Sequence, residues 1–157
     1  MTEKHLAAVI LAAGQGKRMK SVLPKMLHPV AGQPMLGHVI RAAHAVDAQP
    51  VVAVVGHGAE KVRTVLGEQG VSFALQPEQL GTGHALLCAE AALEDFSGDL
   101  LLLCGDVPLL EESTLRRLIA HHRDHAAAVT ILTAVMSDPT GYGRIIRDAG
   151  SVQRIVE

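Results

Sequence analysis

The strongest constraint on the fold is a regular alternation of short apolar runs with segments of helical periodicity. The apolar runs predict strands at 7–13, 51–55, 71–75, 100–104 and 128–135. Helical spacing predicts helices from Pro34 onward, with this proline in the first turn, and then over 59–69, over 83–93 and after Glu111–Glu112. Residues 142–156 predict a small hairpin. This order predicts right-handed βαβ units, and hence an open, mostly parallel α/β sheet with helices on both faces.

Composition fits such a sheet and excludes several function classes. Aromatic residues make up only 2% of the chain and tryptophan is absent, so the core must be aliphatic, as in buried parallel strands. The net charge of -2 is spread along the chain, which gives no clustered basic face for nucleic acid. No apolar run approaches the roughly 20 residues of a membrane span. We expect a cytoplasmic protein with reduced cysteines that binds neither nucleic acid nor membrane.

The loops that follow the predicted strands carry residues suited to chemistry. The strand at 7–13 leads into 14–25, the strand at 71–75 into 76–82, and the strand at 100–104 into Gly105–Asp106. Open α/β sheets bind ligands at the carboxyl ends of their strands. The sequence therefore predicts a binding site that is built from these loops.

The loop at 11–25 (LAAGQGKRMKSVLPK) is suited to phosphate. Its small residues let the backbone approach a ligand, its N–H groups can cradle phosphate oxygens, and Arg18 and Lys25 add positive charge. The loop is not a Walker A motif, and Met19 replaces the third glycine of a dinucleotide fingerprint. Taken alone, it is also compatible with a tight turn that carries solvated basic side chains.

Further blocks of sequence carry a resemblance to a known family. These blocks are GQGKRM at 14–19 with LPK at 23–25, QPEQLGTGHA at 76–85, GDVPL at 105–109 and DPTGYGRI at 138–145. The first resembles sugar-phosphate nucleotidyltransferases in general. Together, in this order, they resemble the bacterial bifunctional N-acetylglucosamine-1-phosphate uridylyltransferase/glucosamine-1-phosphate acetyltransferase over essentially the whole chain. The resemblance implies a Rossmann-like sheet of the nucleotidyltransferase type. It also implies uridylyl transfer from UTP to N-acetylglucosamine 1-phosphate, which feeds cell-wall precursor synthesis.

The same resemblance implies roles for individual residues. It makes Arg18 and Lys25 catalytic and assigns Mg²⁺, as cofactor, to Asp106. It implies substrate contacts by Leu11, Ala12, Ala13, Gly14, Lys25, Gln76, Gly81, Thr82, Cys104, Gly105, Asp106, Gly143 and Glu157. Gln76 would read uracil through its amide, which offers both a donor and an acceptor. Gly143 and Glu157 would contact the sugar.

The chain departs from the family pattern at some positions. Lys17 replaces a usual threonine, and Cys104 stands where relatives carry Tyr or Ser. The resemblance places a second, asparagine metal ligand beyond Glu157, together with the rest of the domain and a left-handed β-helix acetyltransferase domain. We therefore interpret 1–157 as the first part of a nucleotidyltransferase domain with little activity. We expect this chain to be monomeric, whereas the full-length relative forms a homotrimer. The alternatives are a non-catalytic nucleotide-binding fragment and another sugar-phosphate nucleotidyltransferase.

Histidine clusters suggest a competing metal hypothesis. Of the nine histidines, His121 and His125 form an i, i+4 pair on the last predicted helix. The His-Glu-x-x-His arrangement of a zinc site is absent from the sequence, and charged residues surround the pair. We interpret the pair as part of a solvated helix face.

Overall fold

A computed structural model describes residues 5–16, 19–67, 69–148 and 151–156 of the chain. These residues form two compact units, Met1–Ala120 and His121–Glu157, and each is described by itself. No helix in the described ranges is both long enough and apolar enough to cross a membrane.

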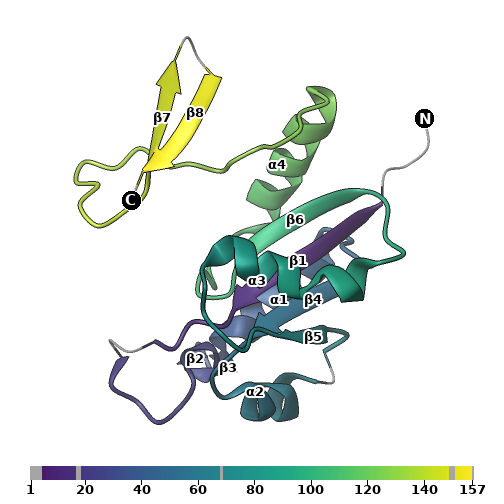
Figure 1. The fold of residues 1–157 in the computed structure, drawn as a ribbon, viewed down its shortest axis with the longest axis vertical. Coiled ribbons are helices and arrows are strands. Elements are labelled where there is room, and N and C mark those ends of the chain that lie inside the picture. Colours follow the sequence, from purple (N-terminus) through teal and green to yellow (C-terminus); the bar gives the residue numbers. More distant parts are fainter. Residues whose placement is uncertain (1–4, 17–18, 68, 149–150, 157) are drawn as a thin grey trace. The chain divides into compact units, whose positions relative to one another are not determined.

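A four-stranded parallel sheet forms the centre of the first unit (Figure 1). Its strands are β1 (Leu6–Ala12), β4 (Val51–Val55), β5 (Ser72–Leu75) and β6 (Asp99–Cys104), in the order β5-β4-β1-β6. Every pair is parallel, and the register places Ile10 beside Ala53 on one side and Leu103 on the other. The prediction of an open parallel sheet is therefore confirmed.

Helices cover both faces of this sheet, because successive strand residues point to opposite sides. On one face, α1 (Met35–Ala45), α2 (Ala59–Leu66) and the start of α4 (Glu112–Asp124) contribute side chains to the same core cluster as Ala8 and Ile10 of β1. On the other face, α3 (Thr82–Cys88) packs against Val9 and Val52. Figure 1 shows α3 lying across the sheet on the side opposite α1. The predicted two-sided arrangement is confirmed.

Short elements that the sequence pattern did not predict connect β1 to α1. They are the 3₁₀ helix η2 (Lys25–Leu27) and the hairpin β2 (Pro29–Val30) and β3 (Gln33–Pro34). The turn of this hairpin places Ala31 and Gly32 at positive φ, as a type I′ turn requires. Pro34 ends β3 and precedes α1, so it does not occupy the first helical turn as predicted.

Two predicted helices are shorter in the structure. The helix predicted over 59–69 ends at Leu66, with Gly67 as its C-cap residue, whose backbone N–H still donates to the Arg63 carbonyl. The helix predicted over 83–93 is divided into α3 and the 3₁₀ helix η3 (Glu90–Leu93).

The second unit contains the predicted hairpin but not the predicted fifth strand. The hairpin is confirmed as β7 (Arg144–Asp148) paired antiparallel with β8 (Ser151–Val156). The strand predicted over 128–135 is wrong, because this segment pairs with no strand in the described parts of the chain. Its side chains at Val129 and Val135 are exposed. An apolar run predicts burial, whereas a strand also needs a neighbouring backbone to pair with.

Candidate functional site

The loops that follow β1 and β6 meet through an ion pair at the carboxyl edge of the sheet. Lys25 Nζ lies 2.5 Å from Asp106 Oδ2, although the two residues are 81 positions apart in the sequence. Lys25 opens η2, and Asp106 is the second residue after β6. Their side chains are 24% and 41% exposed, so a solvent-borne ligand can reach both.

Glycines shape the first loop around Lys25. Gly16 has a φ of +61°, and a Cβ there would lie 2.7 Å from the Cβ of Lys25. Gly58 has a φ of +75°, and a Cβ there would lie 2.7 Å from Cγ of Pro24, the residue before Lys25. Both positions combine a left-handed backbone with a contact that leaves no space for a side chain. The segment that carries Lys25 is thereby packed against the loops that follow β1 and β4.

Gly105 brings Asp106 to the same place. Its backbone N–H donates to the Leu11 carbonyl over 2.9 Å, which extends the pairing of β6 with β1 by one residue. A Cβ at this position would lie 2.9 Å from that carbonyl oxygen and 3.1 Å from the sulfur of Met26. Only glycine lets β6 end this close to β1 without a shift.

Cys104, at the end of β6, lies in the electric field of this ion pair. Partial burial raises the pKa of its thiol, the Asp106 carboxylate raises it further, and Lys25 opposes them with a smaller effect. The thiol is therefore protonated at neutral pH. Cys104 is suited to packing beside a ligand and not to nucleophilic attack.

The loop after β5 forms a second part of the site. Gln76 is only 4% exposed, and its backbone N–H donates to the Val55 carbonyl over 2.8 Å. Gln79 Nε2 donates to the Ala13 carbonyl over 2.5 Å and so joins this loop to the end of β1. A cavity of about 470 Å³ opens here, lined by Gln15, Gly56, His57, Leu75, Gln76, Pro77, Glu78 and Gln79.

Most of the residues expected to touch substrate lie along this edge. Leu11 and Ala12 belong to β1, and Ala13 and Gly14 follow it. Gly81 precedes α3 and Thr82 opens it, while Cys104, Gly105 and Asp106 lie at the end of β6. Gly143 belongs to the second unit, where it directly precedes β7. Arg18 and Glu157 lie outside the described residues.

Some polar residues of the cavity were missed from the sequence. They are Gln15, His57, Glu78 and Gln79. Their position directly after predicted strands was a usable signal, because those strand ends meet in a parallel sheet. Two backbone carbonyls of the expected uridine site already have partners, since Leu11 bonds Gly105 and Ala13 bonds Gln79. The backbone of Gly14 is more open, because a Cβ there would meet no atom within 4 Å.

Asp106 suits a metal ion that arrives with a substrate. Within the described residues, no group of three or more His, Cys, Asp or Glu side chains could enclose a metal. Mg²⁺ commonly binds through one or two carboxylates, with substrate phosphates and waters completing its octahedral shell. A single accessible carboxylate beside a basic side chain fits that coordination.

Comparison with known proteins places the chain in a family. The MobA-like NTP transferase domain matches residues 8–149. The chain is 62% identical to the bifunctional protein GlmU of Syntrophotalea carbinolica, covering 100% of this chain and 34% of that protein. It is 58% identical to the bifunctional protein GlmU of Pelobacter propionicus, covering 98% of this chain and 34% of that protein. The chain thus spans about a third of the length of these curated relatives.

Solved structures agree with the fold. A nucleotidyl transferase from Methanothermobacter thermautotroptrophicus is 26% identical with a TM-score of 0.65, over 76% of this chain and 58% of that one. Rv0371c of Mycobacterium tuberculosis, in complex with manganese, is 25% identical with a TM-score of 0.62, over 74% and 58%. A UDP-glucose pyrophosphorylase complexed with UDP-glucose shares the fold at 17% identity, with a TM-score of 0.61 over 79% and 55%. The match over residues 8–149 shows that the chain belongs to the MobA-like NTP transferase domain family.

Proposed function

We propose that this chain binds UTP at the carboxyl edge of its sheet and transfers the uridylyl group to N-acetylglucosamine 1-phosphate. The observation that carries the proposal is the pairing of Lys25 with Asp106 beside a glycine loop, in a member of an NTP transferase family. One basic and one acidic side chain at 2.5 Å provide a phosphate ligand and a metal ligand at the same point. The relatives named bifunctional protein GlmU support the choice of substrates.

The reaction needs little covalent chemistry from the protein. An ionised phosphate oxygen of the sugar phosphate attacks the α-phosphorus of UTP in line. The new oxygen–phosphorus bond forms while the bond to the pyrophosphate oxygen breaks, and the electron pair leaves with pyrophosphate. The nucleophile is already ionised, so no histidine base and no enzyme-bound intermediate are required. Catalysis then depends on positioning and on neutralising charge.

The residues of the chain divide this work. Lys25, together with Arg18, binds the triphosphate and offsets the negative charge that builds up on the leaving pyrophosphate. Asp106 holds Mg²⁺, which when bound neutralises phosphate charge and helps align the reacting groups. Cys104 and Gly105 form the adjoining wall, since both lie directly before Asp106.

The nucleoside occupies the neighbouring loops. The cavity beside Gln76 takes the uracil ring, with Gly81 and Thr82 packing around the nucleoside. Leu11, Ala12, Ala13 and Gly14 line its approach from the end of β1, where Gly14 leaves open space for a ligand. We assign Gly143 and Glu157 to the N-acetylglucosamine group.

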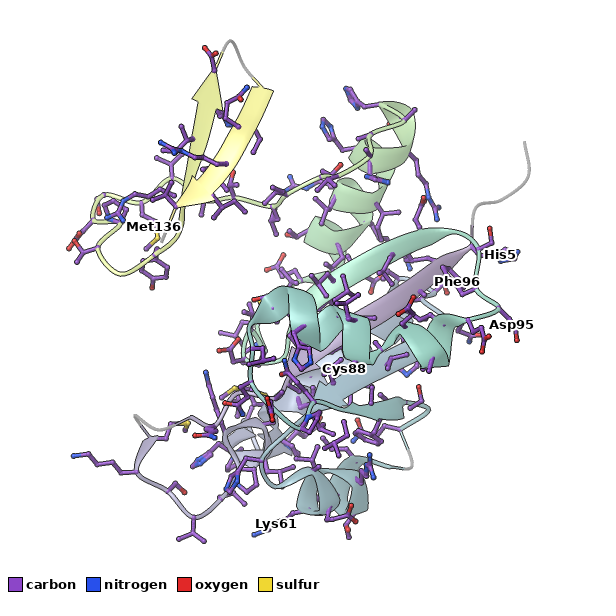
Figure 2. The ribbon with its side chains drawn as sticks, in the orientation of Figure 1. His5, Lys61, Cys88, Asp95, Phe96 and Met136 are labelled. Atoms are coloured by element: carbon purple, nitrogen blue, oxygen red, sulfur yellow. The ribbon has the colours of Figure 1, made fainter. Side chains whose placement is uncertain are left out.

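Release of pyrophosphate from UTP and N-acetylglucosamine 1-phosphate with Mg²⁺ tests the proposal. We expect Lys25→Met to lower the rate by about 10²-fold or more, the usual cost of losing a preorganised charge at a reacting centre. The matched control is Lys61→Met, which removes the same charge from the exposed face of α2 (Figure 2). Equal rates in wild type and Lys25→Met would refute the assigned role. UTP binding without pyrophosphate release would favour a non-catalytic nucleotide-binding protein instead.

A further inference from the structure

Gln76 occupies an unusual position for an amide side chain. It is the one polar residue that the described part of the chain buries, and it also lines the cavity of about 470 Å³. A buried amide must have its hydrogen-bonding groups satisfied or presented to a ligand. Its partners therefore determine what it can offer to a nucleobase.

Both amide hydrogens of Gln76 are already used. Nε2 lies 3.2 Å from the Gly81 carbonyl oxygen and 3.0 Å from His84 Nδ1. A carbonyl oxygen only accepts, so the Gln76 atom that faces it must be the nitrogen. His84 Nδ1 must then accept the second hydrogen, which places the ring proton of the neutral histidine on Nε2.

His84 in turn has a partner for that proton. Its Nε2 lies 3.9 Å from Sγ of Cys88, which is one turn further along α3. Cys88 is labelled in Figure 2. Sulfur is a weak acceptor, and the contact suits an Nε2–H donor. The chain from Cys88 through His84 to Gln76 thus favours a single tautomer of the histidine and a single orientation of the amide.

The amide oxygen of Gln76, Oε1, is the side-chain atom that has not yet been assigned a hydrogen-bond partner. Oε1 has no hydrogen-bond partner in the described residues. An unpaired atom of this kind is either buried or in contact with solvent. Within the described parts of the chain, the one buried side-chain N or O atom without a partner is Arg63 Nε, so Oε1 is not buried. Oε1 is therefore open to solvent, and the space that Gln76 lines is the cavity. Gln76 presents an acceptor there and no donor.

We propose that His84 is a positioning residue that holds the Gln76 amide with its oxygen toward the nucleobase, so that the site selects the imide N3–H of uracil over the unprotonated N3 of cytosine. This inference rests on the proposed function, and it replaces the expectation that Gln76 offers both a donor and an acceptor. Uracil presents N3–H as a donor, whereas cytosine presents an acceptor at the same ring position. If CTP bound, the Gln76 oxygen would face N3 of cytosine. Both atoms are acceptors, so both would remain unpaired in a desolvated cavity.

Binding of UTP and CTP to wild type and to two variants, measured by calorimetry in Mg²⁺, tests the inference. We expect wild type to bind UTP at least about tenfold more tightly than CTP, because leaving a buried polar group unpaired costs about a factor of ten or more in affinity. His84→Phe keeps a ring of similar size but removes the acceptor, which frees one amide hydrogen to turn toward the cavity. Its preference for UTP should fall to about threefold or less. His84→Asn restores an acceptor oxygen near the position of Nδ1 and should keep the preference.

The ratio of the two affinities separates positioning from a structural role. If His84 only stabilised the loop, its loss would weaken UTP and CTP binding alike and leave the ratio unchanged, which would overturn the inference while leaving the proposed function intact. Wild type with equal affinity for the two nucleotides would also overturn it. Binding of neither nucleotide to wild type would refute the proposed function and this inference with it. UTP methylated at N3 gives a test without mutation, because wild type that binds it as tightly as UTP contradicts an N3–H contact.

Discussion

Gly105→Ala is the substitution that most sharply tests how the sheet builds the site. The new Cβ would lie 2.9 Å from the Leu11 carbonyl oxygen, 3.1 Å from the sulfur of Met26 and 3.3 Å from the Cβ of Ala12. Two of these three neighbours belong to β1, where the backbone is held in the sheet and cannot move alone. Overpacking of this kind costs about 1–3 kcal/mol of folding stability. At this chain length, that corresponds to a fall in Tm of about 3–9 °C.

The assay is thermal unfolding of Gly105→Ala beside Gly14→Ala, followed by UTP titration. A Cβ at Gly14 would meet nothing within 4 Å, so that variant should unfold at or slightly above the wild-type temperature. In the titration, Gly105→Ala should weaken UTP binding because Asp106 is displaced from Lys25. Gly14→Ala should weaken it because the methyl group occupies space that the nucleotide needs. Wild-type stability of Gly105→Ala would refute the close approach of β6 to β1.

Other expectations follow from burial and charge. Leu115→Ala should lower the free energy of unfolding by about 2–5 kcal/mol in urea titrations, since this α4 side chain is fully buried in the core. Unchanged stability would mean that α4 does not pack on the sheet. Lys25→Met should change stability by less than about 1 kcal/mol, because the ion pair is partly exposed, and a larger loss in the same titration would show a structural role. Alkylation of Cys104 by iodoacetamide, followed by mass spectrometry in metal-free buffer, should be slow at neutral pH, because burial and Asp106 raise the pKa of its thiol. Asp106→Asn should lower that pKa and speed the reaction, whereas an unchanged rate would remove Asp106 as a cause.

The sheet and its helices could be predicted because their signals are local. Each of β1, β4 and β6 is a short apolar run, and α1 and α2 repeat apolar residues at helical spacing. The edge that carries the site followed from topology alone, since parallel strands end on the same side. The hairpin of β2 and β3 escaped prediction because its two-residue strands are too short to show a period.

The contacts within the site could not be predicted from spacing. Lys25 and Asp106 are 81 positions apart, and Gln79 and Ala13 are 66 apart, so only the folded chain shows which pairs meet. The orientation of the Gln76 amide depends on Gly81 and His84 together, and pattern alone left it open. The strand predicted over 128–135 failed for a related reason. Its apolar character could be recognised from the sequence, but whether another strand lies beside it to pair with could not.

Amide hydrogen exchange with and without UTP and Mg²⁺ tests most directly whether the loops after β1, β5 and β6 form one nucleotide site. We predict that UTP slows exchange together in peptides that cover 11–16, 76–82 and 104–106. A groove of about 420 Å³, lined by Gln33, Pro34, Gly37, Ile40, Arg41, His44 and Gln69, serves as the internal comparison and should be unaffected. Protection confined to that groove, or none anywhere at saturating UTP, would contradict the site.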